Sequence, residues 1–426
     1  MILVKVHSKT LARIAAATLV LPMLAHCGGG AGTGPVGPPP IELPIGPNVT
    51  AITVDAGVNA NQINIPSVSV TICTPGTASC QTINHILLDT ASTGLRIMAS
   101  ALSPSVVLPQ VRTAAGDPMF ECLIFANKDY IWGSVRTADV QIANGKASSL
   151  AVQIVSDHNT DASIPVTPTD CSESNLVPPP AGLNSVTSFG SNGVLGISVF
   201  QQDCGPACVT IANPGGLGFY YGCPASGCVG TTVSSVAAEV QNPISQLAGN
   251  DHNGVLIVLP SLGPAGQGTA IGALALGIDT ESNNQLGTAT VLGLNPVTGN
   301  FTTIYKGQTL SASFLDTGSN VLFFDDTTLP ACAAAAFYCP TSAQALSATN
   351  HGQGANSTPT TVSFRIVNEA SVTTVGANFA AFDDIGGPSS DRNSFDWGLP
   401  FYFGRKVFLA FEAQTTSTAT GPFVAY

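Results

Sequence analysis

The sequence predicts an all-β protein built of two lobes. Three observations lead to this fold class. The 426 residues suffice for two hydrophobic cores. Short apolar stretches alternate with turns, which suits the 44 glycines and 30 prolines of a chain that is 44% hydrophobic. A short motif that ends a buried strand occurs once in each half of the chain.

The repeated motif places a carboxylate at the end of an apolar strand. Residues 86–97 read Ile-Leu-Leu-Asp-Thr-Ala-Ser-Thr-Gly-Leu-Arg-Ile, and residues 313–324 read Ser-Phe-Leu-Asp-Thr-Gly-Ser-Asn-Val-Leu-Phe-Phe. Asp, Thr, Gly and Ser after an apolar run are typical of a tight, hydrogen-bonded turn. One copy alone is compatible with an ordinary β-turn. Two copies with the same apolar flanks predict that Asp89 and Asp316 meet.

Two aspartates that meet in this way form a dyad that shares one proton. Like charges about 3 Å apart cannot both be ionised, so one carboxyl holds a proton while the other stays charged. Such a pair can act as acid and base toward a water molecule. The candidates for orienting the two carboxyls are the neighbouring residues Thr90, Ser92, Thr317, Gly318 and Ser319.

At these motifs the sequence resembles the pepsin-like, two-lobed aspartic peptidases. In that family, a downstream strand of two apolar residues and a glycine closes each aspartate loop. Residues 192–198 (Asn-Gly-Val-Leu-Gly-Ile-Ser) are similar to the first-lobe copy, and residues 396–403 (Asp-Trp-Gly-Leu-Pro-Phe-Tyr-Phe) to the second. The resemblance implies an N-terminal lobe over residues 51–278, a C-terminal lobe over 279–426, and an active-site cleft between them.

The resemblance also implies an activity, that of an aspartic endopeptidase. Such an enzyme uses no cofactor or metal and binds its polypeptide substrate in extended form. The chain departs from the family at Ala91, where the first motif normally has glycine. The hairpin predicted within 120–157 lacks the family's Gly-Thr-Gly flap tip. Tyr130 and Trp132 are candidates for the flap's aromatic residue, although core packing is the favoured alternative.

These departures leave a second function open, that of a catalytically weak, pepsin-like lipoprotein used for binding or assembly in the cell envelope. The chain is also similar to an uncharacterised group of bacterial lipoproteins with the same paired motifs. Retention of both aspartates favours the peptidase. A monomer is expected in either case.

The N-terminal residues predict export and a lipid anchor. Basic residues precede an apolar segment over 14–24 that is too short for a comfortable membrane span. Leu24-Ala25-His26-Cys27 resembles a lipobox, which makes residues 1–27 a lipoprotein-type signal peptide and Cys27 the lipidation site. An ordinary signal peptide cut nearby is the alternative.

The segment after the signal peptide predicts a tether, because residues 28–50 are rich in glycine and proline and have no apolar periodicity. The expected location is therefore the envelope of a bacterium. The protein would be anchored to the outer membrane, facing the periplasm or the surface, or be secreted.

The 11 cysteines support an oxidising compartment, since ten remain for five disulfides once Cys27 is lipidated. Short spacings suggest four pairs and leave Cys122 and Cys171 over, although spacing alone does not establish connectivity. A Cys-rich insertion spans residues 204–232, where a zinc site is the rival interpretation. The suggested pairs are Cys73 with Cys80, Cys204 with Cys208, Cys223 with Cys228, and Cys332 with Cys339.

Composition argues against several other classes of protein. The net charge is −12, and the 13 Lys and Arg residues are scattered, which argues against a nucleic-acid partner. No Gly-x-Ser-x-Gly motif supports a serine hydrolase. The six histidines include no His-Glu-x-x-His, so metal-dependent hydrolysis has no support.

Overall fold

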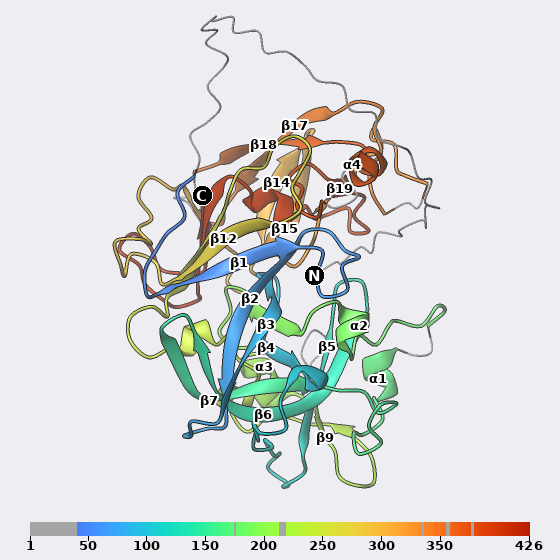
Figure 1. The fold of residues 1–426 in the computed structure, drawn as a ribbon, viewed down its shortest axis with the longest axis vertical. Coiled ribbons are helices and arrows are strands. Elements are labelled where there is room, and N and C mark those ends of the chain that lie inside the picture. The colour runs from blue at the N-terminus through green and yellow to red at the C-terminus, as the bar shows by residue number, and fades with distance from the viewer. Residues whose placement is uncertain (1–40, 174–175, 213–218, 334–335, 355–357, 376–378) are drawn as a thin grey trace, which may run out of the picture.

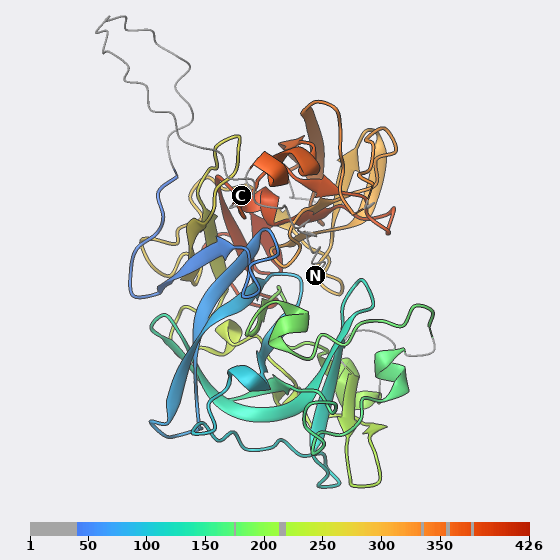
Figure 2. The ribbon, with the colours of Figure 1, turned by 45° about the vertical axis from the view of Figure 1, so that its right-hand side comes forward.

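The computed structural model describes residues 41–173, 176–212, 219–333, 336–354, 358–375 and 379–426. The predicted signal peptide, Cys27 and most of the predicted tether therefore lie outside the described residues. The described chain is mostly β-strand and forms two lobes, one below and one above in Figures 1 and 2. The predicted all-β, two-lobed fold is confirmed.

Strands from the first half of the chain build the lower lobe. The first of them, β1, lies at the boundary and runs along the upper lobe (Figure 1). These strands are β1 (Val49–Asp55), β2 (Ile65–Cys73), β3 (Cys80–Asp89), β4 (Thr93–Met98), β5 (Met119–Ile124), β6 (Tyr130–Ile142), β7 (Gly145–Val155), β8 (Gly193–Ile197), β9 (Phe219–Gly222) and β10 (Val229–Gly230). The hairpin predicted within 120–157 is present as β5, β6 and β7. The Cys-rich insertion joins the same sheet, because β9 pairs with β5.

The later strands build the upper lobe. They are β11 (Gly254–Leu259), β12 (Ala270–Leu276), β13 (Val291–Gly293), β14 (Phe301–Tyr305), β15 (Gln308–Asp316), β16 (Leu322–Phe323), β17 (Gln344–His351), β18 (Thr360–Ile366), β19 (Gly386–Gly387), β20 (Asp396–Gly398), β21 (Arg405–Ala410) and β22 (Phe423–Ala425).

One sheet connects the two lobes. It continues from the lower lobe through β1, β12, β11 and β21 to β22 and β13. A second sheet, formed by β14 to β20, lies within the upper lobe. The backbone hydrogen bonds of the first sheet thus join strands on both sides of residue 278, and the lobe boundary at that residue stays a prediction.

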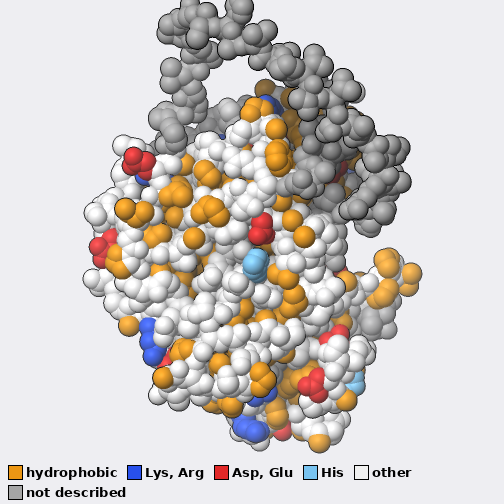
Figure 3. All heavy atoms as spheres, in the orientation of Figure 1, with side chains coloured by type: hydrophobic (Ala, Val, Ile, Leu, Met, Phe, Trp, Pro, Cys, Tyr) orange, Lys and Arg blue, Asp and Glu red, His pale blue; other side chains and the backbone are white. Residues whose placement is uncertain are grey.

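Helices are short and lie between strands. In the described parts of the chain, none is long and apolar enough to cross a membrane. The helices are α1 (Thr169–Ser172), α2 (Val186–Phe189), α3 (Pro206–Thr210) and α4 (Glu369–Val375), with 3₁₀ turns η1 (Ala99–Ala101), η2 (Val236–Ala238), η3 (Ile244–Gln246) and η4 (Leu399–Tyr402). Few charged side chains interrupt the face shown in Figure 3, in keeping with a chain of which only 9% is charged.

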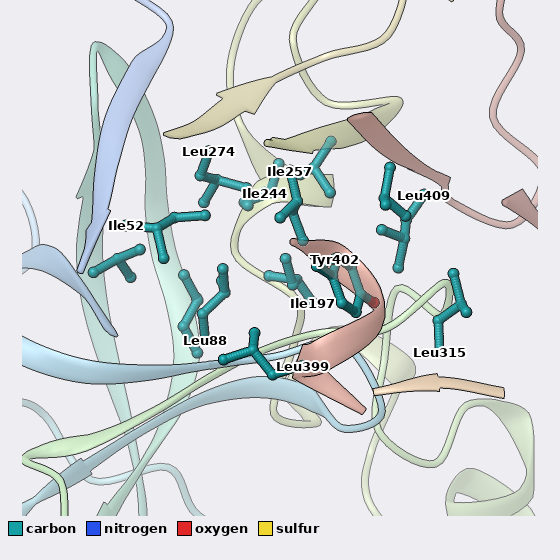
Figure 4. Close-up of a cluster of buried hydrophobic side chains, with 14 of the residues drawn as sticks. Ile52, Leu88, Ile197, Ile244, Ile257, Leu274, Leu315, Leu399, Tyr402 and Leu409 are labelled. Carbon is teal, nitrogen blue, oxygen red and sulfur yellow. The ribbon is translucent and has the colours of Figure 1, made fainter. Parts of the chain in front are cut away.

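The main hydrophobic core lies directly beneath the two aspartate motifs. Leu88 and Leu315, which precede the aspartates, are part of it together with Ile197, Leu399 and Tyr402 (Figure 4). The last residues of β3 are buried without alternation because other elements cover both faces of this strand. An uninterrupted apolar strand end therefore carries the Asp89 carboxyl into the interior.

Disulfides stabilise the loops between strands. The four pairs suggested by short spacing are confirmed, and Cys122 pairs with Cys171. All four cysteines of the insertion are in disulfides, so the zinc interpretation is wrong. Cys332 and Cys339 lie within 4.8 Å of a Glu369 oxygen, but their sulfurs are bonded to each other and do not offer a metal site.

Candidate active site

Each aspartate is the last residue of a strand that runs parallel to a glycine-containing strand. Asp89 at the end of β3 lies opposite Gly196 on β8, and Asp316 at the end of β15 lies opposite Gly398 on β20. The resemblance implied this arrangement. The two halves of the chain therefore deliver their aspartates by the same local topology.

The two glycines are required because the motif's turn passes over them. A β-carbon on Gly196 would lie 2.8 Å from the carbonyl carbon of Ser92. On Gly398 it would lie 2.1 Å from the carbonyl oxygen of Val321. Both separations are shorter than any carbon side chain tolerates, so only glycine permits the close approach.

In the first motif, the Asp89 carboxylate is held by its own loop. Its Oδ1 accepts a hydrogen bond from the Ala91 amide at 2.9 Å, and its Oδ2 accepts one from the Ser92 hydroxyl at 2.6 Å. The alanine that replaces the usual glycine leaves both bonds in place.

The second motif repeats these contacts. The Gly318 amide donates to Asp316 Oδ1 at 2.7 Å, and the Ser319 hydroxyl donates to Oδ2 at 2.7 Å. Ser319 therefore binds its aspartate as Ser92 does in the first loop, and Gly318 takes the place of Ala91.

Thr90 and Thr317 join the two loops to each other. The Thr317 amide donates to Thr90 Oγ1 at 2.9 Å, and the Thr90 amide donates to Thr317 Oγ1 at 3.1 Å. Each hydroxyl donates in turn to a carbonyl of the opposite strand, that of Leu315 or Leu88. Both threonines are buried. The reciprocal bonds fix the position of one aspartate relative to the other.

Tyr402 extends this arrangement on one side only. Its hydroxyl lies 3.0 Å from Thr90 Oγ1, and because the Thr90 proton goes to Leu315, Tyr402 is the donor. Sequence reasoning missed this role, since Tyr402 reads as one more aromatic residue in an apolar stretch.

The two carboxyls are close enough to influence each other. A β-carbon placed on Gly318 would lie 2.7 Å from Asp89 Oδ1 and 3.1 Å from Asp316 Oδ1, so one point contacts both groups. Both side chains are buried. Burial and the charge of Asp316 raise the pKa of Asp89 from 3.8 to about 6.

A third carboxyl, that of Asp396, belongs to the same cluster. Its Oδ2 lies 2.7 Å from the Ser319 hydroxyl, which also contacts Asp316. The sequence placed Asp396 in the predicted closing strand of the second lobe, but no role was predicted for it. An acidic residue inside an apolar strand was the available signal.

The flap candidates do not face the aspartates. Trp132 is fully buried and stacks on Phe120 at 5.3 Å between ring centroids, with Tyr221 edge-on. The favoured alternative of core packing therefore holds for Trp132. Tyr130 is half-buried, and its backbone pairs with residues near Gly182.

A cavity of about 250 Å³ lies between the lobes beside the Asp89 loop. Its walls are mostly apolar, and neither Tyr130 nor Trp132 is among them; the turn after β5 contributes instead. The lining includes Ala91, Leu123, Phe125, Val199, Phe200, Leu294, Phe301, Phe314 and Leu315. A second cavity, of about 300 Å³, lies within the upper lobe and contacts neither aspartate loop.

Comparison with known proteins finds a matching family model and similar solved structures. A family model described as "Protein of unknown function (DUF3443)" matches residues 44–426. No curated protein gives a match. The chain is similar to a solved structure titled "Crystal structure of aspartic proteinase from Irpex lacteus". The sequence identity is 16%, the coverage is 88% of this chain and 96% of that chain, and the TM-score is 0.48.

Proposed function

The chain belongs to the family described as "Protein of unknown function (DUF3443)", and we propose that this member is an aspartic endopeptidase whose dyad is Asp89 and Asp316. The observation that carries the proposal is the reciprocal bonding of Thr90 and Thr317. It brings together two loops that each hold a carboxylate by one amide and one hydroxyl. A chance pair of buried aspartates has no reason to share this double arrangement.

The dyad would work by moving two protons in opposite directions. Asp89, with its raised pKa, holds the shared proton, and Asp316 is the charged base. Asp316 takes a proton from water, the oxygen adds to the peptide carbonyl carbon, and Asp89 protonates the carbonyl oxygen. The resulting diol then returns a proton to Asp89, Asp316 protonates the nitrogen, and the carbon–nitrogen bond breaks.

The cavity beside Ala91 supports an apolar side chain next to the cleaved bond. Its walls come from both lobes, and Phe200, Phe301 and Phe314 offer apolar contact area. The proposed substrate is a polypeptide bound in extended form. The lipid anchor at Cys27, the bacterial envelope location and the monomeric state belong to the same proposal.

The alternative is a catalytically weak protein that uses the cleft for binding or assembly. One observation favours it, namely that Tyr130 and Trp132 do not line the cavity. The turn of the hairpin contributes Phe125 to the cavity wall, but neither of the two aromatic residues expected of a flap lies over a substrate there.

Cleavage of reduced casein across pH 3–8 tests the proposal. The chain from Gly28 onward is compared with Asp89→Asn and Asp316→Asn, and with Asp161→Asn as a matched control on an exposed loop. Each dyad variant should lose at least about 100-fold in rate, the effect of removing an acid or base group. The control should keep its rate, and a statine-type inhibitor should block the parent. Absence of cleavage by the parent at every pH, or undiminished cleavage by either dyad variant, would leave the binding alternative.

A further inference from the structure

Ser319 lies between two buried carboxyls. Its hydroxyl is 2.7 Å from Asp316 Oδ2 and 2.7 Å from Asp396 Oδ2. A hydroxyl has one proton and can donate to only one of them. At this separation the other carboxyl must itself carry a proton and donate to the hydroxyl oxygen.

We propose that Asp396 carries this proton and donates it in a hydrogen bond to Ser319, which donates in turn to Asp316. Asp396 is then a positioning residue that acts through Ser319 and keeps Asp316 in the charged, base role. The inference rests on the proposed function where it concerns catalysis. The position of the proton is a property of the folded chain alone.

The surroundings of Asp396 favour its neutral form. The residue is only 2% exposed, and its Oδ1 has no hydrogen-bond partner in the described structure. Its strand neighbours are Phe314 on β15 and Phe323 on β16. A charged carboxylate there would leave one oxygen buried and unsolvated, which is strongly unfavourable. A protonated acid leaves only a weak carbonyl acceptor unpaired.

The charged and titratable groups near Asp396 act in the same direction. Asp316 faces it from the end of β15, Asp89 from the end of β3, and Tyr402 lies on η4. Burial and the charge of Asp316 raise the pKa of Asp396 well above its usual range. A second negative charge beside Asp316 is therefore unfavourable.

The first motif has the same strand arrangement as the second but no acidic residue at the position of Asp396. Asp396 lies opposite Phe314, two residues before the Asp316–Gly398 pair. The residue at the same register in the first motif is Val194, which lies opposite Leu87, two residues before the Asp89–Gly196 pair. Asp396 therefore makes two otherwise matching loops unequal. A hydroxyl that accepts one hydrogen bond donates a stronger one, so Ser319 is a better donor to its aspartate than Ser92.

Stability against pH tests where the proton is. A folded-state pKa above the unfolded value stabilises the protein below about pH 4, and this contribution is lost as the pH rises through the folded-state value. Wild-type Tm should therefore fall more steeply between pH 4 and 8 than that of Asp396→Asn or of Asp396→Val, the variant that copies the first lobe. Equal slopes for all three proteins would overturn the assignment of the proton to Asp396.

A double-mutant cycle tests the bond to Ser319. If Asp396 donates to it, the losses in unfolding free energy from Ser319→Ala and Asp396→Val should not add. Additive losses would overturn the proposed chain of hydrogen bonds. Neither measurement needs enzymatic activity, so both decide the inference even if the parent cleaves nothing.

Cleavage kinetics then test the effect on Asp316. At pH 4–5, Asp396→Val should lower kcat by about tenfold with little change in KM, which is the effect of one lost hydrogen bond. In Asp396→Asn the amide can still donate to Ser319, so kcat should recover to within about threefold of wild type. A Val variant as active as the Asn variant would remove the positioning role.

Discussion

The Thr317 amide donates to the Thr90 hydroxyl at 2.9 Å while the Thr90 amide donates to the Thr317 hydroxyl at 3.1 Å. Thr90 is the more heavily bonded of the two, because Tyr402 also donates to it. Replacing Thr90 by valine leaves two buried donors without an acceptor, and replacing Thr317 leaves one.

We therefore expect Thr90→Val to lower the unfolding free energy by about 2–4 kcal/mol and Thr317→Val by about 1–3 kcal/mol. Urea unfolding measures both. Thr90→Ser keeps the hydroxyl and serves as the control. A Thr90→Val variant as stable as Thr90→Ser would show that the reciprocal bonds contribute little.

The two motifs should respond differently to exchange of their small residues. Gly318→Ala places a β-carbon 2.7 Å from Asp89 Oδ1, which the dyad cannot accommodate without moving. We expect it to lower kcat/KM by at least about tenfold, since small displacements of reacting groups are costly. Ala91→Gly removes a methyl group from the cavity wall and should have a much smaller effect. Equal losses in both variants would mean that the carboxyls are not as close as described.

Activity should decline as the pH rises through about 6. The dyad needs one proton, and the pKa of Asp89 is raised to about 6 by burial and by the charge of Asp316. A pH profile of kcat on a peptide substrate measures this decline. A rate that keeps increasing from pH 6 to pH 8 would contradict the role of a shared proton.

The same pKa predicts how stability depends on pH. Protonation of Asp89 contributes about 3 kcal/mol that is present below pH 4 and lost as the pH rises through about 6. Asp89→Asn should therefore be more stable than wild type at pH 7.

Asp326 is a matched control, because its pKa is shifted in the opposite direction. Although burial opposes it, hydrogen bonds from Lys306 and Tyr305 lower the pKa of Asp326 to about 2, so Asp326→Asn should be less stable at pH 7.

A buried ionic cluster next to the first motif should be essential for folding. Arg96 on β4 contacts Glu121 at 2.5 Å and Asp203 at 3.0 Å, and all three side chains are nearly inaccessible to solvent. Arg96→Met would leave these carboxyls without a cation and should cost about 3–5 kcal/mol at pH 8. Burial raises the pKa of Asp203 well above its usual range, so the loss should shrink at pH 5 as Asp203 takes up a proton. Urea unfolding at the two pH values checks this, and an equal loss at both would argue against charge as the cause.

The sequence by itself determined the features that depend on neighbouring residues. The apolar strand ends, the turn residues after Asp89 and Asp316, and the duplication of both were sufficient to predict the fold class and the pairing of the aspartates. Short spacing likewise predicted disulfides such as Cys73 with Cys80. These signals are local, because strand periodicity, turn chemistry and short loop closure all act over a few residues.

Only the tertiary structure decided the features that depend on strand register. Asp396 and Tyr402 contact the dyad loops from more than 75 residues away in the chain, as the separation of 77 between Ser319 and Asp396 shows. Trp132 turned into the core, and Cys122 found Cys171 across 49 residues. A side chain's partner depends on which face of a strand it occupies, and a one-residue change of register moves it to the other face. The motifs therefore identified the two aspartates, whereas packing selected the residues that hold them.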